Sequence, residues 1–270
     1  MRTTLVTGAA RGIGLAVARR LGREGARLAL VDRQGSALAD AARELGRKGV
    51  DVYTVAADVT ERADMERAVE TAAPRGHLDV VVHCAGVSPT MAPGPEILRV
   101  NLGGTLAVLA AADRCLGDGS AVVLVGSSSA ALAGVLFDET IGDPRDPDVA
   151  ARLARHLEAP GAAYGISKRA VVLLAQRLAL PFGRRGIRIN TVSPGLADTV
   201  MGRQEEAQTP IIPEMQKQIP FPRMVRPEEV AAAVAFLAGP EAGFITGADL
   251  LIDGGCVATL GAGWAGRGRR

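Results

Sequence analysis

The chain has few aromatic residues and few cysteines. Only 3% of its 270 residues are aromatic, and it contains 3 cysteines and 3 histidines. The cysteines (Cys84, Cys115 and Cys256) form no CxxC pair, which argues against a disulfide framework or a cysteine zinc site and favours a reducing compartment. The histidines form no HxxxH or HExxH pattern. We therefore expect a cytoplasmic protein with no metal site.

Long apolar runs and an excess of charge of one sign are also missing. No run approaches the roughly 18 residues of a membrane span, and no basic segment followed by an apolar core suggests a signal peptide. The formal net charge is only +2. The basic cluster Arg267, Arg269 and Arg270 lies in a glycine-rich stretch, 262–270, that we expect to be a flexible tail. We therefore expect neither a nucleic-acid partner nor a membrane partner.

Short β-branched runs alternate with longer alanine-rich amphipathic segments. Several of the short runs, such as Val80-Val81-Val82, are apolar without alternation, as parallel strands covered on both faces require. The expected strands are 3–7, 27–32, 51–56, 78–83, 121–125, 187–192 and 249–252. The expected helices are 12–24, 36–48, 63–73, 97–116, 164–182 and 227–237. This alternation predicts an α/β fold: a single-domain, Rossmann-type, doubly wound parallel sheet of about seven strands over residues 1–270.

Two stretches interrupt the alternation of strands and helices. Residues 130–161 contain Asp143-Pro144-Arg145-Asp146-Pro147 and then a helical pattern over 148–158, and we interpret them as an insertion. Residues 198–226 form a long loop that contains four prolines among apolar side chains such as Phe221 and Met224. A loop of this length in a compact domain usually serves binding, so we expect a lid over a hydrophobic substrate.

The first strand leads into Thr7-Gly8-Ala9-Ala10-Arg11-Gly12-Ile13-Gly14 and then into a helix. Glycines at this turn allow the backbone to approach a pyrophosphate closely, and the exposed N–H groups of the helix can bind it. This pattern predicts a dinucleotide site that includes Gly8, Arg11, Gly12, Ile13 and Gly14.

An acidic residue at the end of the second strand favours NAD over NADP. Asp32 lies 18 positions after Gly14. A carboxylate there can accept hydrogen bonds from both ribose hydroxyls and repels a 2′-phosphate. Arg11 and Arg33 favour the opposite choice, because either could bind that phosphate. We give Asp32 more weight, because an unpaired carboxylate beside a dianion costs more than a lost arginine contact.

Later strands end in further candidate cofactor contacts. Asp58-Val59 could contact the adenine, although Asp58 could equally be the N-cap of the following helix. Cys84-Ala85-Gly86 allows the backbone to pass close to a ribose. These motifs are weak when taken singly.

Tyr164 and Lys168 are spaced i, i+4 at the start of an expected helix, so they lie on one face. A free tyrosine has a pKa of about 10 and is a poor base at neutral pH. A nearby ammonium, together with the positive charge of an oxidised nicotinamide, would lower that pKa. The pair is a candidate for acid–base catalysis.

Taken together, these motifs resemble the short-chain dehydrogenase/reductase family along nearly the whole chain. The resemblance rests on the glycine turn, Asp58, Cys84-Ala85-Gly86, Asn101-Leu102-Gly103-Gly104, Ser127-Ser128-Ser129, Tyr164-xxx-Lys168, Ser193-Pro194-Gly195 and Asp253-Gly254-Gly255. It implies NAD(P)-linked chemistry on a carbonyl/alcohol pair. Tyr164 would be the acid/base, Lys168 would hold the ribose, Ser127 would bind the substrate oxygen, and Asn101 would maintain a helix kink with a proton-relay water. It also implies cofactor contacts from Tyr164, Lys168, Pro194, Gly195 and Thr199.

The chain departs from the family pattern in three places. Cys84 stands where the family usually has an asparagine that braces the backbone. Three consecutive serines leave the catalytic one open among Ser127, Ser128 and Ser129. The spacing from Ser127 to Tyr164 is 37 positions, much longer than is usual. The extra segment is similar to that of the bacterial 3α-hydroxysteroid dehydrogenase/carbonyl reductase branch.

Two other kinds of protein use the same framework: a dinucleotide sensor without catalysis, and a dehydratase, epimerase or lyase. The sensor would be expected to lack part of the tetrad, which is complete here. The resemblance further implies a homodimer or homotetramer through the helices at 97–116 and 164–182, with the insertion placed to cover the second of them.

Overall fold

The computed structural model describes residues 2–73, 76–133 and 138–261. The expected tail at 262–270 lies outside the described residues. Seven parallel strands form one sheet in the order β3-β2-β1-β4-β5-β6-β7. Their bounds are β1 Thr3–Thr7, β2 Arg27–Asp32, β3 Val52–Ala56, β4 Val80–His83, β5 Ala121–Val125, β6 Arg188–Pro194 and β7 Asp249–Ile252. The predicted Rossmann-type doubly wound sheet is confirmed.

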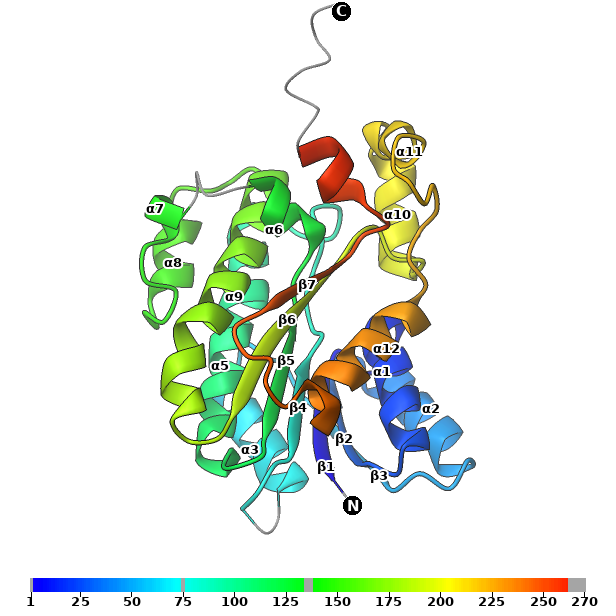
Figure 1. Cartoon of the computed structure of the whole chain (residues 1–270), viewed down its shortest axis with the longest axis vertical. Coiled ribbons are helices and arrows are strands. Elements are labelled where there is room, and N and C mark those ends of the chain that lie inside the picture. The colour runs from blue at the N-terminus through cyan, green and yellow to red at the C-terminus, as the bar shows by residue number, and fades with distance from the viewer. Residues whose placement is uncertain (1, 74–75, 134–137, 262–270) are drawn as a thin grey trace, which may run out of the picture.

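Helices cover both faces of this sheet (Figure 1). One face carries α1 Gly12–Arg23, α2 Gly35–Gly46 and α12 Pro227–Ala238, and the other carries α3 Arg62–Ala72, α4 Gly94–Leu98, α5 Gly104–Ala112 and α9 Pro160–Gly183. Each face has its own apolar core. The strands contribute alternate side chains to each core; in β1, for example, Leu5 packs on one face and Val6 on the other. Because both faces are covered, the strands are apolar without alternation.

The expected single helix at 97–116 is interrupted. A π-helical turn, Arg99–Gly103, separates α4 from α5, and a 3₁₀ turn follows at Asp113–Cys115. The buried Asn101 side chain spans the interior there. Its Oδ1 accepts the Val87 N–H at 2.9 Å, and its Nδ2 donates to the Val87 carbonyl at 3.1 Å and to Ser167 Oγ at 3.2 Å. A widened helical turn held by such bonds is typical of functional sites.

The insertion is packed into the core on the side of α4 and α9. It contains α7 Asp138–Ile141 and α8 Val149–Ala154, so the helix expected at 148–158 is shorter than predicted. Ile141, Val149 and Leu153 are buried in the shared apolar core. Arg169 of α9 donates two 2.7 Å bonds to Asp138. Helix α9 begins at Pro160, so Tyr164 lies in its second turn and not at its start as we predicted.

The segment at 198–226 was expected to be a loop, but it contains two helices, α10 Val200–Gln208 and α11 Ile211–Gln216. The two ends of the segment are joined by backbone bonds. The Val225 N–H donates to the Leu196 carbonyl at 2.9 Å, and the Asp198 N–H donates to the Val225 carbonyl at 2.8 Å. In α11, Pro210 is the N-cap and Pro213 lies in the first turn, where the ring is tolerated, so these prolines do not prevent a helix there. Helix α10 contains no proline.

Candidate active site

One cavity of about 1230 Å³ lies at the carboxyl ends of the strands, beneath α10 and α11. It opens beside the point where the strand order reverses, between β1 and β4. Doubly wound folds bind ligands at this reversal. All but one of the expected site residues line it: Gly8, Arg11, Gly12, Ile13, Gly14, Asp32, Arg33, Asp58, Val59, Cys84, Ala85, Gly86, Ser127, Tyr164, Lys168, Pro194, Gly195 and Thr199. The exception, Asn101, lies behind the cavity wall.

The glycine turn between β1 and α1 fits a pyrophosphate. Gly8 has φ +64°, and a Cβ there would lie 2.8 Å from the Ala85 nitrogen. A Cβ on Gly14 would lie 2.1 Å from the Gly8 carbonyl oxygen. Helix α1 has no side-chain cap and no acidic residue in its first turn. Its free N–H groups and positive dipole end therefore face the cavity, as an anion site requires.

Asp32 closes the cofactor end of the cavity. Its carboxylate accepts the Ala10 N–H at 3.1 Å and the Gln34 N–H at 2.9 Å, which fixes its orientation. Arg11 and Arg33 also line the cavity, but both are exposed. The Asp32 carboxylate is suited to accept hydrogen bonds from ribose hydroxyls, as in NAD. The two arginines are suited to bind the 2′-phosphate of NADP.

Asp58 is not the N-cap of the following helix, because α3 has Glu61 in that position. The Asp58 carboxylate instead accepts the Thr60 N–H at 2.9 Å and the Thr60 hydroxyl at 2.8 Å. Burial raises the pKa of Asp58, but the Thr60 bonds together with the charges of Arg99 and Arg33 outweigh this effect, and the net pKa is lowered. Asp58 therefore shapes the turn at the cavity wall.

Lys168 is buried next to the loop that follows β4. Its Nζ donates to the Val125 carbonyl at 2.9 Å and lies 5.9 Å from the centroid of the Tyr164 ring. Burial lowers the pKa of Lys168 to about 8. The backbone carbonyl at the end of β5 thus sets where the ammonium lies.

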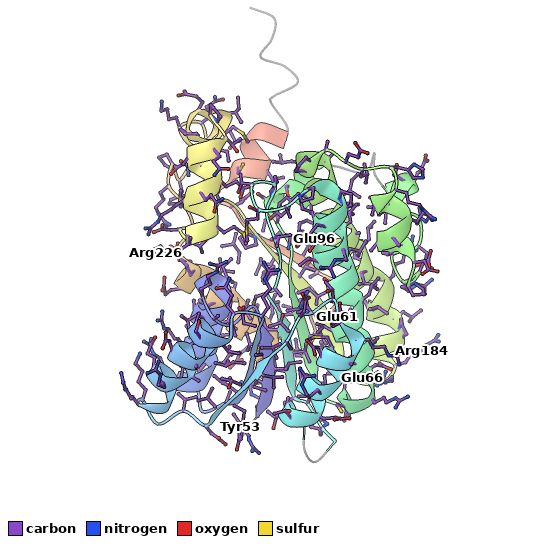
Figure 2. All side chains as sticks on the ribbon, turned by 180° about the vertical axis from the view of Figure 1, so that it is seen from behind. Tyr53, Glu61, Glu66, Glu96, Arg184 and Arg226 are labelled. Atoms are coloured by element: carbon purple, nitrogen blue, oxygen red, sulfur yellow. The ribbon has the colours of Figure 1, made fainter. Side chains whose placement is uncertain are left out.

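Tyr164 is half-buried, and it is the one of the chain's two tyrosines that lines the cavity. The other, Tyr53, lies on β3 at the end of the molecule away from α10 and α11 (Figure 2). Burial and then the charge of Glu205 raise the pKa of Tyr164 to about 12, while the Ser127 hydroxyl lowers it. In the chain alone, the Lys168 ammonium does not lower the pKa of Tyr164 as we expected.

The three serines occupy different positions. Ser127 is the one that interacts with Tyr164. Ser129 donates its hydroxyl to Ser127 Oγ at 2.8 Å, and its N–H lies 3.2 Å from the same atom. Ser128 is buried and begins helix α6, Ser128–Ala133. The geometry thus favours Ser127 as the group that faces a substrate oxygen.

Sequence reasoning missed two residues of the site. Glu205, on α10, lines the cavity and affects Tyr164, but its segment was expected to be a loop. His83 bonds Thr7 beneath the glycine turn, with 2.8 Å between Nδ1 and Oγ1. His83 immediately precedes Cys84-Ala85-Gly86 in the sequence, and this position could have identified it as a residue near the site.

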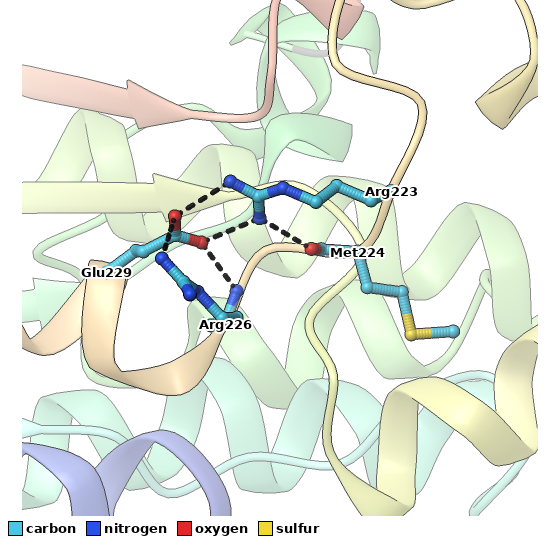
Figure 3. Close-up of polar contacts among 4 residues, drawn as sticks. All are labelled: Arg223, Met224, Arg226 and Glu229. Carbon is cyan, nitrogen blue, oxygen red and sulfur yellow. Dashed lines mark hydrogen bonds and ion pairs between the residues drawn. The ribbon is translucent and has the colours of Figure 1, made fainter.

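The apolar side chains of the segment 198–226 do not all reach the cavity. Ile212, Met215, Ile219 and Phe221 line the cavity, whereas Met224 does not. The predicted contact of Met224 with a substrate is therefore wrong. Its backbone carbonyl instead accepts Arg223 at 3.0 Å, next to a carboxylate bridge in which Glu229 joins Arg223 and Arg226 (Figure 3).

The described residues contain no group of three or more histidine, cysteine or acidic side chains that could hold a metal ion. Among the same residues, no helix is both long and apolar enough to cross a bilayer.

Comparison with known proteins identifies relatives along the whole chain. Residues 2–137 match the family model described as short chain dehydrogenase, and residues 150–257 match that described as enoyl-(acyl carrier protein) reductase. D-threitol dehydrogenase of Mycolicibacterium smegmatis is 34% identical over 94% of this chain and 92% of its own length. Cis-4-hydroxycyclohexanecarboxylate dehydrogenase of Sinomonas cyclohexanicum is 35% identical over 95% and 97%.

A solved structure agrees with these matches. A short chain dehydrogenase from Burkholderia cenocepacia in complex with NADP is similar with a TM-score of 0.77 and 30% identity, covering 94% of this chain and 97% of the other. These relatives do not resolve a branch of the family. The chain belongs to the short-chain dehydrogenase/reductase family, whose enzymes use NAD(P) and act on CH–OH groups.

Proposed function

We propose that this protein interconverts a hydrophobic secondary alcohol and its ketone, with NAD(H) as the preferred cofactor and Tyr164 as the acid/base. One observation carries the proposal: Tyr164, Ser127 and Lys168 line the same cavity as the glycine turn and Asp32. The two named relatives act on alcohols, one of them on a ring. Cyclic alcohols, including hydroxysteroids, are therefore the first substrates to test.

The bound nicotinamide would accept the hydride from the carbinol carbon or return it. Ser127 would donate a hydrogen bond to the substrate oxygen, with Ser129 holding its orientation. Tyr164, with a pKa raised to about 12 in the chain alone, is protonated at neutral pH and suited to donate a proton to the forming alkoxide. In oxidation it must first release that proton, so alcohol oxidation should rise with pH.

Tyr164→Phe tests this assignment. We expect NADH binding, followed by cofactor fluorescence, to remain, while turnover followed by nicotinamide absorbance falls by about 10²–10⁴-fold. Lys168→Met should weaken both cofactor binding and turnover, because the family resemblance assigns the Lys168 ammonium to the ribose. Tyr53→Phe is the matched control and should leave turnover unchanged. Substantial turnover by Tyr164→Phe would refute the proposal.

The proposal extends to assembly and location. A homodimer is favoured over a homotetramer, because α7 and α8 of the insertion pack against α9 and α4, the side that the family resemblance assigns to subunit contacts. Light scattering of the intact chain should give the mass of a dimer, and a tetramer would overturn this. A cytoplasmic location remains our prediction from the isolated cysteines.

A further inference from the structure

Five acidic side chains line the cavity: Asp32, Asp58, Glu205, Glu229 and Asp253. Four of them accept hydrogen bonds from the chain. Asp32 and Asp253 accept backbone N–H groups, Asp58 accepts Thr60, and Glu229 accepts two arginines. Within the described residues, Glu205 alone among the five accepts no hydrogen bond and forms no ion pair.

Helix α10 is anchored at its start, on the side that carries Glu205. Thr199 caps the helix by accepting the Gly202 N–H at 3.0 Å, and Arg203 is bonded to Asp198 at 2.7 Å. Gly202 packs so closely that a Cβ there would lie 1.9 Å from the Ala197 carbonyl oxygen. Glu205 follows Gly202 by three positions, so both lie on the same side of the helix. Both line the cavity.

The surroundings of Glu205 provide little compensation for its charge. Glu205 is half-buried, and the helices α10 and α11 supply apolar side chains such as Met201, Ile212 and Met215 to the same cavity. Burial raises the pKa of Glu205. A carboxyl in an apolar wall costs free energy unless it is hydrogen-bonded. A molecule bound in the cavity could therefore supply the hydrogen-bond donor that the Glu205 carboxyl lacks.

We propose that Glu205 is a substrate-recognition residue that accepts a hydrogen bond from a second donor group, a hydroxyl or an amine, on a substrate whose carbinol faces Tyr164. This rests on the proposed function, which it narrows from a hydrophobic alcohol to an apolar frame with a further donor. A mono-alcohol of the same shape would leave the Glu205 carboxyl without a partner. An unpaired polar group of this kind in a binding site discriminates strongly against the substrate that lacks the donor.

Binding at Glu205 would also affect the acid/base. The negative charge of Glu205 raises the pKa of Tyr164. Tyr164 also has Ser127, which lowers its pKa, and Lys168, whose Nζ lies 5.9 Å from the centroid of its ring. A substrate donor that binds the Glu205 carboxylate would weaken the effect of its charge on Tyr164. The bound substrate would thereby lower the pKa of Tyr164 and favour release of its proton.

Three substrates of one shape test the proposal: cyclohexanol, cyclohexane-1,4-diol and 4-aminocyclohexanol. For the wild type we expect kcat/KM to be about tenfold to hundredfold higher for the diol or the amino alcohol than for cyclohexanol. Glu205→Leu should remove this preference while still oxidising cyclohexanol. Glu205→Gln should retain part of a preference for the diol, because its amide oxygen accepts, but should lose a preference for the amine.

The pH profile provides a second readout that a merely structural role would not move. Glu205→Gln removes the charge that opposes ionisation of Tyr164, so the rise of cyclohexanol oxidation with pH should shift to lower pH. Glu206→Gln, next to it on α10 but outside the cavity lining, is the matched control and should keep both the preference and the profile.

The outcomes separate the two proposals. Turnover of all three alcohols with equal kcat/KM, or an unchanged preference in Glu205→Leu, overturns the role of Glu205 and leaves the proposed function standing. A wild type that oxidises none of these alcohols and no hydroxysteroid with NAD or NADP overturns both.

Discussion

The hydroxyl of Thr7 lies 2.8 Å from Nδ1 of His83, its partner in the pairing of β1 with β4. The same hydroxyl oxygen accepts the N–H groups of Cys84 at 3.2 Å and Ala85 at 3.3 Å. A hydroxyl carries one proton, so that proton points to His83, and Nδ1 is the acceptor. Thr7 and His83 therefore brace the loop after β4, where Cys84 replaces the family's usual asparagine.

Removal of the Thr7 hydroxyl should loosen this loop. Thr7→Val leaves the Ala85 N–H and the His83 ring nitrogen without their partner, while the Cys84 N–H keeps the Thr7 backbone carbonyl at 3.3 Å. We expect a loss of about 1–3 kcal/mol in the free energy of unfolding. The KM for NAD should rise, because Cys84 and Ala85 line the cavity. Denaturant unfolding and initial-rate kinetics measure the two effects. Thr7→Ser keeps the hydroxyl and should remain close to wild type; a Thr7→Val protein of wild-type stability would argue against the brace.

His83 should make stability depend on pH. Burial, followed by the charge of Lys168, lowers the pKa of His83 from 6.5 to about 3. The unfolded chain therefore takes up this proton first as the pH falls. The contribution of neutral His83 to stability is full above pH 6.5 and declines from there toward pH 3; at pH 5 the loss is about 2 kcal/mol.

Urea unfolding at pH 7 and pH 5 checks this dependence. His83→Asn cannot titrate, so it should lose less stability than the wild type over this range. His156→Gln, at an exposed position, is the control and should follow the wild type. Equal pH dependence for His83→Asn and the wild type would contradict the assignment.

Glu229 joins the end of the lid segment to helix α12 (Figure 3). It accepts Arg223 at 2.8 Å through each carboxylate oxygen, and it also accepts the Arg226 backbone N–H at 2.9 Å. The hydrogen bonds from the Arg223 side chain, followed by those from Arg226, lower the pKa of Glu229 to about 2. The bridge should therefore remain ionised at any pH used for assay.

Glu229→Gln should release the lid end without affecting the cofactor loop. We expect KM for a bulky alcohol to rise a few-fold, as partly exposed ion pairs are worth about 1 kcal/mol or less, with KM for NAD unchanged. The exposed neighbour Glu228 supplies the control Glu228→Gln. A parallel rise in both KM values would indicate a general loss of structure and not a role in the lid.

Asp32 should decide between the two nicotinamide cofactors. In Asp32→Ser the carboxylate is removed while Arg11 and Arg33 remain, so the ratio of kcat/KM for NAD to that for NADP should fall more than about tenfold. Adding Arg33→Gln should weaken use of NADP again. A wild type that prefers NADP would refute the NAD assignment at once.

Several features could be predicted from local sequence, because the interactions that create them are local. The β-branched runs, the glycines around Gly8 and the i, i+4 spacing of Tyr164 and Lys168 each depend on neighbouring residues. They predicted the sheet, the glycine turn and the pair Tyr164 and Lys168 that lines the cavity. All the expected cofactor residues did come together at one edge, because the carboxyl ends of parallel strands meet there.

Other features were decided only by contacts between distant segments. The π-helical turn depends on Asn101 reaching Val87 and Ser167, and the choice among the serines depends on which one meets Tyr164. The fold of the segment 198–226, which carries α10 and Glu205, depends on Val225 bonding back to Leu196 and Asp198. No periodicity in the sequence records such contacts, since the free energy that selects them arises only when the segments pack together.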